Sequence, residues 1–341
     1  MSDDGRSSES SARGWRTLIW PLVALALLLI FNAIRNPGFF RVEIINGQLY
    51  GSVIDIVDQA APILIVSLGM TLVIATAGVD LSVGAVMAIA GATAAIAVTR
   101  EQGGLVFALV AALGAGVLAG FWNGTLVALC RIQPIVATLI LMVAGRGIAQ
   151  LLTDGQIVTF TDPGLAFLGG GHAFGVPAPA LIAVAMLGVV AGLVRLTALG
   201  LFIESVGDNE TASRLAGIPV ASVKVFAYTL TGLLAGVAGL IEAGDIRAAD
   251  ANTTGLYLEL DAILAVVIGG TPLTGGRMRL IGTVLGALII QTLTTTILTT
   301  GVDARWTLVV KALVVLAVCL LQSERARDLL RRRRANGGAP S

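Results

Sequence analysis

Lysine, histidine and cysteine are almost absent from this chain, and their scarcity excludes several kinds of chemistry. The two lysines, Lys224 and Lys311, do not follow a glycine, so the chain has no G-x-x-x-x-G-K-[ST] motif to hold a nucleotide phosphate. His172 is the single histidine, which leaves little for a histidine-based catalytic relay. Cys130 and Cys319 have no disulfide or metal-binding spacing. We therefore expect neither an enzyme nor a cofactor or metal.

Charge is also scarce, and this points to a membrane. Charged residues make up 13% of the chain and hydrophobic residues 56%, with a mean hydropathy of +0.91, whereas soluble domains carry about 25% charge. The fold class that we predict is an all-α, polytopic membrane bundle. Windows of about twenty apolar residues predict ten spans, at roughly 17–34, 57–76, 80–98, 105–129, 134–152, 179–195, 224–243, 259–271, 280–298 and 306–322. The eighth is short for a crossing, so eight or nine spans stay open.

The distribution of basic residues predicts the orientation of the chain. With ten spans, most arginines and lysines fall on the side of the two termini, and four consecutive arginines, Arg331–Arg334, lie near the end. By the positive-inside rule both termini are cytoplasmic. We read the arginines as an orientation signal in a lipid bilayer and expect no nucleic-acid partner. The predicted domains are a polar tail (1–16), a permease domain (17–322) and an arginine-rich tail (323–341).

The stretch from Ala60 to Thr99 has Asp80 as its only formal charge. It is long enough to cross a bilayer twice, with a turn near Gly78. A charge in hydrocarbon costs at least about 2.5–3.5 kcal/mol, so Asp80 should face protein or water. Alternatively, Asp80 is an N-cap of the third span, with its carboxylate accepting from backbone N–H groups near Val83.

Several other polar residues interrupt the apolar segments. Such residues tend to face a bundle interior or a water-filled cavity, because lipid cannot satisfy them. Neutral sugars need hydrogen-bond donors and acceptors without a countercharge, and this set suits them. The residues that we predict to line a translocation pathway are Asp80, Ser82, Asn123, Arg146, Gln150, Glu259 and Asp261. The alternative is an ion pair between helices, with Arg146 or Lys311 neutralised by a carboxylate.

Glycines recur at every fourth position in several spans. Gly116, Gly120 and Gly124 form one such ladder, and Gly232 and Gly236 form another. Small residues at this spacing allow helices in lipid to approach closely. We predict tight packing within one bundle in preference to a dimer interface.

The loop at 196–223 is the one sizeable cytoplasmic connection that we predict. Asp208 and Asn209 are N-cap residues, Glu210 favours a first turn, Gly217 suits a C-cap, and Pro219 prevents continuation of a helix. We therefore predict a short capped helix over 210–216. It is either a docking element for a partner or an ordinary amphipathic surface helix.

Four groups of motifs, in this order, resemble a known family. They are the run Gly69–Gly84, the Pro134–Leu139 segment, the Gly207–Ala212 loop, and Glu259–Ile263 followed by Gly269-Gly270 and Gly275-Gly276-Arg277. Over about 17–322 the chain resembles the ribose-type monosaccharide permeases of ABC importers. Within the family, 75–93, 139–150 and 243–265 are most similar to the permease of the bacterial galactofuranose importer. The family commonly has glycine at the position of Ala77.

The resemblance implies a multi-pass protein of the bacterial inner membrane that moves a monosaccharide, with galactofuranose as a candidate. It implies three partners: a second permease (the same or a related chain), a cytoplasmic ABC ATPase, and a periplasmic sugar-binding protein. By similarity, the ATPase would dock on Glu204, Asp208, Asn209, Glu210 and Arg214. The rival hypothesis is a secondary transporter that couples to protons or sodium through Asp80, Glu259 or Asp261.

Overall fold

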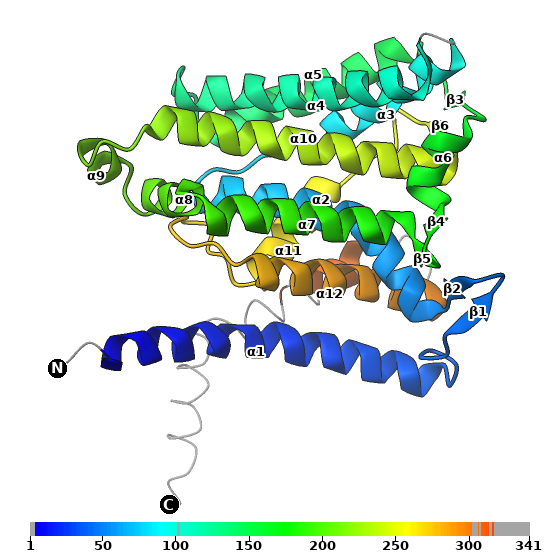
Figure 1. The fold of residues 1–341 in the computed structure, drawn as a ribbon, viewed down its shortest axis with the longest axis horizontal. Coiled ribbons are helices and arrows are strands. Elements are labelled where there is room, and N and C mark those ends of the chain that lie inside the picture. Colours follow the sequence, from blue (N-terminus) through cyan, green and yellow to red (C-terminus); the bar gives the residue numbers. More distant parts are fainter. Residues whose placement is uncertain (1–3, 101–102, 302–305, 307, 314–315, 317–341) are drawn as a thin grey trace, which may run out of the picture.

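A computed structural model describes residues 4–100, 103–301, 306, 308–313 and 316. Long helices run side by side along its longest axis (Figure 1). The helices are α1 (Asp4–Arg35), α2 (Ser52–Ala75), α3 (Val83–Thr99), α4 (Gly104–Ala128), α5 (Pro134–Leu152), α6 (Pro163–Gly170), α7 (Ala178–Leu196), α8 (Leu199–Asp208), α9 (Glu210–Leu215), α10 (Val220–Ile246), α11 (Leu258–Ile268) and α12 (Leu280–Thr299). The predicted all-α bundle is therefore confirmed.

The two ends of the bundle differ in structure. One end holds three antiparallel two-stranded ladders, β1 (Glu43–Ile45) with β2 (Gln48–Tyr50), β3 (Val158–Thr159) with β6 (Ala248–Ala249), and β4 (His172–Ala173) with β5 (Val176–Pro177), together with α6. We call it the hairpin end. The opposite end holds α8, α9 and the loop 269–279, and we call it the α9 end (Figure 1).

Seven helices in the described part of the chain are long and apolar enough to cross a membrane. They are Leu18–Arg35 of α1 and all of α2, α4, α5, α7, α10 and α12. The number of ten spans is not confirmed, because α3 falls short at 17 residues and α11 has only 11. The predicted tenth span (306–322) and the tail (323–341) lie largely outside the described residues. The predicted polar tail 1–16 enters α1 from Asp4 on.

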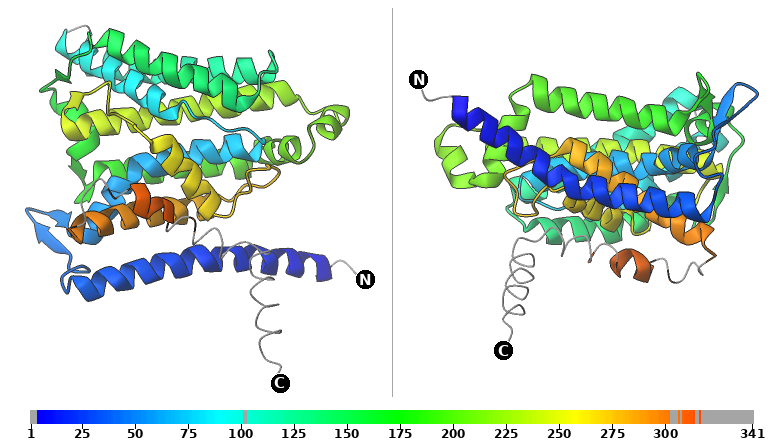
Figure 2. Two further views of the ribbon diagram at one scale, coloured as in Figure 1. Left: turned by 180° about the vertical axis from the view of Figure 1, so that it is seen from behind. Right: turned by 90° about the horizontal axis from the view of Figure 1, so that it is seen from below.

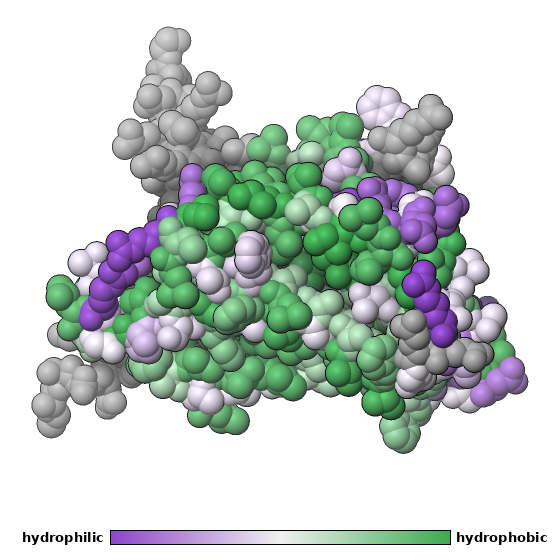
Figure 3. Space-filling model, turned by 90° about the horizontal axis from the view of Figure 1, so that it is seen from above, coloured by the Kyte–Doolittle hydropathy of each residue, from purple (hydrophilic) through white to green (hydrophobic). Residues whose placement is uncertain are grey.

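The surface agrees with a position in a membrane. In Figure 3 the middle of the visible face is mostly hydrophobic, while the most hydrophilic residues lie toward the two ends. Exposed apolar side chains such as Val110, Leu118 and Val143 cover the outward faces of α4 and α5. Because lipid tails tolerate such a surface, the protein is a multi-pass membrane protein.

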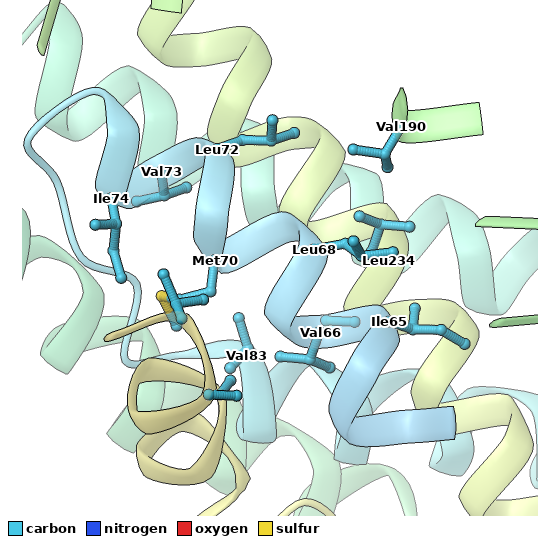
Figure 4. Close-up of a cluster of buried hydrophobic side chains, with 14 of the residues drawn as sticks. Ile65, Val66, Leu68, Met70, Leu72, Val73, Ile74, Val83, Val190 and Leu234 are labelled. Atoms are coloured by element: carbon cyan, nitrogen blue, oxygen red, sulfur yellow. The ribbon is translucent and has the colours of Figure 1, made fainter. Parts of the chain in front are cut away.

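Helix α2 is the centre of the core. Most of its length is buried, in contact with α7, α10, α11 and α12. Figure 4 shows Ile65, Leu68 and Leu72 of α2 close to Leu234 of α10 and Val190 of α7. Helix α1 instead lies on the outside of the bundle (Figure 2), where Asn32 Nδ2 donates to Thr296 Oγ1 of α12 at 2.6 Å.

The glycine ladders pack α4 against α10. A Cβ placed on Gly116 would lie 2.5 Å from the carbonyl oxygen of Gly232, and one on Gly120 would lie 2.3 Å from that of Tyr228. Both distances are too short for a side chain, so only glycine permits this approach. The prediction that the ladders serve packing within one bundle is confirmed.

Candidate functional site

Two short helices, α3 and α11, begin in the interior of the bundle and run toward opposite ends. After α2, residues 76–82 turn back from the α9 end before α3 starts at Val83 and runs toward β3 and β6. Helix α11 starts at Leu258 and leads through the loop 269–279 to α12. At 1.5 Å per residue α11 is about 16 Å long, about half of a hydrocarbon core.

The starts of these two helices touch. A Cβ on Gly84 would lie 2.2 Å from the carbonyl oxygen of Gly255 and 2.6 Å from Glu259 Oε2. Gly255 itself has a φ of +64° and would clash with the backbone of Gly84. Non-helical backbone at this depth is tolerated only inside protein or beside a cavity. The meeting point therefore needs protein or a cavity around its non-helical backbone.

Asp80, Ser82 and Asn123 form a buried polar group beside this meeting point, which we call the Asp80 cluster. Asp80 Oδ1 accepts from the Ser82 backbone N–H at 2.9 Å and from Ser82 Oγ at 2.7 Å. Asn123 Nδ2, from α4, donates to Ser82 Oγ at 2.8 Å. All three are at most 1% exposed. The donors are neutral, and no described cation pairs with Asp80.

The N-cap alternative for Asp80 is wrong about the cap residue, but the Asp80 carboxylate does accept from a backbone N–H next to Val83. Ser82 is the N-cap of α3 and makes no side-chain capping bond. Asp80 instead accepts from the N–H two residues ahead, which closes a local turn. Ala77, where the family commonly has glycine, keeps a left-handed backbone with φ of +62°. The turn before Asp80 therefore keeps a conformation that favours glycine, although alanine occupies the position.

Arg146 and Gln150 of α5 reach the loop that precedes α11, residues 250–257. Arg146 donates to the carbonyl oxygens of Ala251 at 3.0 Å and Thr254 at 2.6 Å. Gln150 donates to the side-chain oxygen of Asn252 at 2.8 Å. Arg146 therefore binds backbone carbonyls, and the expected alternative of a direct ion pair does not apply to it in the described residues.

Glu242 holds the same loop from the other side and was not among the predicted site residues. Its two carboxylate oxygens accept from the backbone N–H of Gly255 at 3.1 and 3.2 Å. The signal in the sequence was a single acidic residue in a long apolar segment, which gives no indication of a partner. Arg146 and Glu242 together fix the backbone from which Glu259 projects.

Glu259 and Asp261 lie in the first turn of α11 but have different surroundings. Glu259 is 4% exposed and lies against Gly84. Asp261 Oδ2 accepts from Lys311 Nζ at 2.8 Å, and both side chains are mostly buried. The alternative of an interhelical ion pair is therefore confirmed for Lys311 and Asp261. A paired carboxylate in this position holds α11 to the segment 308–313.

The predicted docking residues gather at the α9 end. Helix α9 spans Glu210–Leu215, and Asn209 caps it by accepting from the Ala212 N–H at 2.9 Å. Glu210 accepts from Arg214 at 2.9 Å and from Lys224 at 2.6 Å. The predicted short capped helix is confirmed, while Asp208 belongs to α8, which was not predicted.

Glu204 connects this region to the bundle interior. Its Oε1 accepts from the backbone N–H of Met278 at 2.8 Å. In the same loop, Gly276 N–H donates to the carbonyl oxygen of Ala75, the last residue of α2, at 3.0 Å. Helix α8, the loop 269–279 and the end of α2 are thus hydrogen-bonded in series.

Apolar helices surround two short helices that begin in the bundle interior beside the buried Asp80 cluster, an arrangement that is typical of transporters. The comparisons then give the family. Residues 52–319 match the family described as branched-chain amino acid transport system / permease component, and the chain belongs to it.

Three relatives align along almost the whole chain. The galactofuranose transporter permease protein YtfT of Escherichia coli (strain K12) is 54% identical over 317 residues, covering 93% of each chain. The fructose import permease protein FruF of Bifidobacterium longum (strain NCC 2705) is 40% identical, covering 93% of this chain and 92% of the relative. The ribose import permease protein RbsC of Escherichia coli (strain K12) is 38% identical, with 92% and 98% covered. No solved structure matches.

The predicted resemblance to the ribose-type sugar permeases of ABC importers is therefore confirmed. These relatives are import and transport permeases, and they give no support to the ion-coupled alternative. The chain is accordingly a transport subunit.

Proposed function

We propose that this chain is the membrane-spanning permease of an ABC importer that carries a monosaccharide, with galactofuranose as the first candidate. The observation that carries the proposal is the 54% identity to a galactofuranose permease over 93% of both chains. The absence of a P-loop motif from the sequence agrees with a separate ATPase. A periplasmic sugar-binding protein and a second permease, identical or related, complete the importer.

The sugar would pass the point where α3 and α11 begin. Discontinuous helices with polar residues near the middle of a bundle are typical of substrate sites in transporters. Around this point the chain offers Asp80, Ser82 and Asn123 on one side and Glu259 on the other, next to the contact between Gly84 and Gly255. These four side chains can donate hydrogen bonds to sugar hydroxyls or accept them, and none of the four is a cation. Arg146 acts there through backbone carbonyls, Gln150 through the side chain of Asn252, and Asp261 through its ion pair with Lys311.

The orientation that we propose places the α9 end and both termini in the cytoplasm. The excess of arginine on that side of the sequence supports it. The α9 helix would then meet the ATPase, with Glu210 and Arg214 on its exposed surface. The hairpin end would face the periplasm and the sugar-binding protein.

Coupling would follow the hydrogen bonds between α8 and α2. A shift of α8 and α9 on ATPase docking acts on Met278 through Glu204, and on the end of α2 through Gly276. Because residues 76–82 continue directly from α2, the same shift reaches Asp80. This gives a continuous, testable connection between the docking helix and the bundle interior.

Reconstitution tests the importer class. Proteoliposomes with this permease and its second permease, the ATPase and the binding protein should accumulate sugar only with ATP, and a protonophore should leave uptake unchanged. Vesicles with the chain alone should take up nothing. Uptake by the chain alone, or immediate collapse with the protonophore, would refute the proposal.

The cargo needs a separate measurement. With the complete importer present, uptake of galactofuranose should exceed that of ribose and fructose at equal concentration. A preference for ribose or fructose would keep the importer class and reject galactofuranose. Uptake of a branched-chain amino acid in preference to any sugar would reject the sugar assignment altogether.

A further inference from the structure

A hollow at the α9 end is lined by three cations and one carboxylate. It consists of two adjoining pockets of about 270 and 390 Å³ between the α4–α5 turn and the start of α10. Arg131 and Arg214 line both pockets, while Lys224 and Glu210 line the first. Together the pockets reach the size range of small-molecule sites, about 300–1,000 Å³. We call this hollow the basic groove.

The groove has unneutralised positive charge. Glu210 uses one carboxylate oxygen for Arg214 and the other for Lys224. Arg131 has no hydrogen-bond or ion-pair partner among the described residues. Its guanidinium offers five N–H donors in a fork that fits phosphate or carboxylate oxygens. The groove is therefore complementary to an anion.

The backbone of Arg131 is held in an uncommon conformation. Its φ is +56°, in the left-handed region that favours glycine. The neighbouring bonds from Cys130 N–H to Thr125 O at 3.1 Å and from Ile132 N–H to Leu126 O at 3.0 Å fix this turn. An arginine where glycine would be less strained suggests that its side chain has a role.

The groove lies where two candidate membrane spans end. Helix α4 ends at Ala128 and α5 begins at Pro134, so the turn between them is at the boundary of the apolar region. Leu129, which lines the second pocket, is 63% exposed, and Ile135 and Val136 in the first turn of α5 are 44% and 46% exposed. A ligand that fits this setting has an anionic head for the cations and apolar chains for these side chains.

We propose that the basic groove binds the phosphate headgroup of an anionic phospholipid, with the acyl chains along Leu129, Ile135 and Val136. Basic pockets between membrane helices are suited to such headgroups. A soluble anion would not use the exposed apolar side chains beside Arg131. The proposal does not depend on the cargo of the permease, and its test needs no transport.

Native mass spectrometry of the purified full-length chain tests the proposal. The detergent-solubilised protein is mixed with equal amounts of phosphatidylglycerol and phosphatidylcholine with the same acyl chains. Wild type should retain phosphatidylglycerol preferentially. Arg131→Gly should fold at least as well, because glycine relieves the left-handed backbone, yet its phosphatidylglycerol retention should fall about fivefold.

The substitution Arg131→Gly could change the turn between α4 and α5, so a second pair of variants leaves that turn untouched. Ser222 is exposed in the first turn of α10 and lines the groove. Ser222→Glu should not destabilise the helix start, where a negative charge is favourable, but should repel the anionic headgroup. Ser222→Gln is its uncharged control. Arg195→Gln, which removes an exposed arginine from the last turn of α7, should leave lipid retention unchanged.

Three results would overturn the proposal. The first is equal retention of both lipids by wild type. The second is phosphatidylglycerol retention at the wild-type level by both Arg131→Gly and Ser222→Glu. The third is a loss of phosphatidylglycerol retention in Arg195→Gln as large as that in Arg131→Gly. The proposal would also fail if Arg131→Gly kept phosphatidylglycerol but, when mixed with the ATPase, no longer formed a complex with it on size exclusion, because the groove would then belong to the partner protein.

Discussion

Asp80 and Glu210 are both carboxylates with two close hydrogen-bond donors near a helix start, but their surroundings are opposite. Asp80 is 1% exposed and accepts from the N–H and hydroxyl of Ser82, which are neutral. The Glu210 side chain is 44% exposed and accepts from two cations, Arg214 and Lys224. Buried polar groups cannot exchange their partners with water, whereas exposed ion pairs can. In this conformation the interior cluster therefore keeps its partners, whereas the α9 end can exchange its partners for those of another protein.

The largest effect is expected from Asp80→Ala, which removes the shared acceptor of the interior cluster. The buried N–H and hydroxyl of Ser82 would lose their partner, at a cost of about 1–3 kcal/mol for each stranded group. Thermal unfolding in detergent should show a clear loss of stability, and uptake by the reconstituted importer should vanish. Asp80→Asn, which keeps an acceptor oxygen, should be closer to wild type in stability. If Asp80→Ala were as stable as wild type, the buried hydrogen bonds of Asp80 would contribute no more to stability than the exposed ion pairs of Glu210, contrary to the comparison.

The second-largest effect is expected from separating α4 from α10. Helix α4 carries Asn123, and its close packing helps to bring Asn123 to Ser82. Gly120→Val puts a side chain where a Cβ would lie 2.3 Å from the Tyr228 carbonyl oxygen. Overpacking of this kind costs about 1–3 kcal/mol and should move α4 away from α10. Unfolding should occur at a lower temperature than in Gly114→Val, whose Cβ meets nothing within 4 Å. Equal effects of the two variants would rule out close α4–α10 packing as the cause.

A smaller effect on stability is expected from Glu210→Gln combined with Arg214→Gln. The exposed Glu210–Arg214 pair contributes about 0–1 kcal/mol, and a glutamine at position 210 still offers the less exposed Lys224 an acceptor, so the double variant should fold and insert normally. Stimulation of the partner ATPase by the sugar-loaded binding protein should nevertheless be lost, because the docking surface has changed. Arg195→Gln is the matched control at the same end of the bundle. Normal stimulation in the double variant would exclude these residues from docking.

The smallest effect is a pH dependence confined to α9. The hydrogen bond from Lys224, with the charges of Lys224 and Arg214, holds the pKa of Glu210 below its ordinary value of 4.5 despite partial burial. A carboxyl with a lower pKa in the folded state stabilises the fold above its unfolded pKa, and this contribution is lost as the pH falls through the folded value. Hydrogen-exchange protection of α9 should therefore drop below about pH 4.5. Glu210→Gln should remove the pH dependence, and if it does not, another group is responsible.

Features that depend on near neighbours were predicted well. The α5 boundaries, 134–152, coincide with the structure, and the capped helix after Asn209 is where its caps indicate. The glycine ladders were assigned to packing within the bundle, and α4 and α10 bear this out. Apolar length, caps and small-residue spacing are all local signals. Helices α6 and α8 were missed because they are short, and α8 lies in the segment 196–223 that we read as a loop.

For features that depend on distant parts of the chain, the sequence showed which residues were unusual but not which partners they contact. The sequence marked Arg146, Glu242 and Lys311 as polar residues in apolar segments, but gave no indication that the first two hold the loop 250–257 or that the third pairs with Asp261. The third and eighth predicted spans also became the shorter helices α3 and α11. Hydropathy cannot distinguish a helix that crosses a membrane from one that begins inside the bundle, because both are apolar.

The sequence by itself determined that this protein is a helical membrane bundle without a nucleotide-binding motif, since composition, hydrophobic length and helix caps act over short distances along the chain. Only the tertiary structure decided that α3 and α11 start next to each other, that Asn123 completes the Asp80 cluster, and that Arg131 faces a groove with Arg214 and Lys224. These pairs are far apart in the sequence, and they meet only because glycine-lined helices pack closely enough to bring them together.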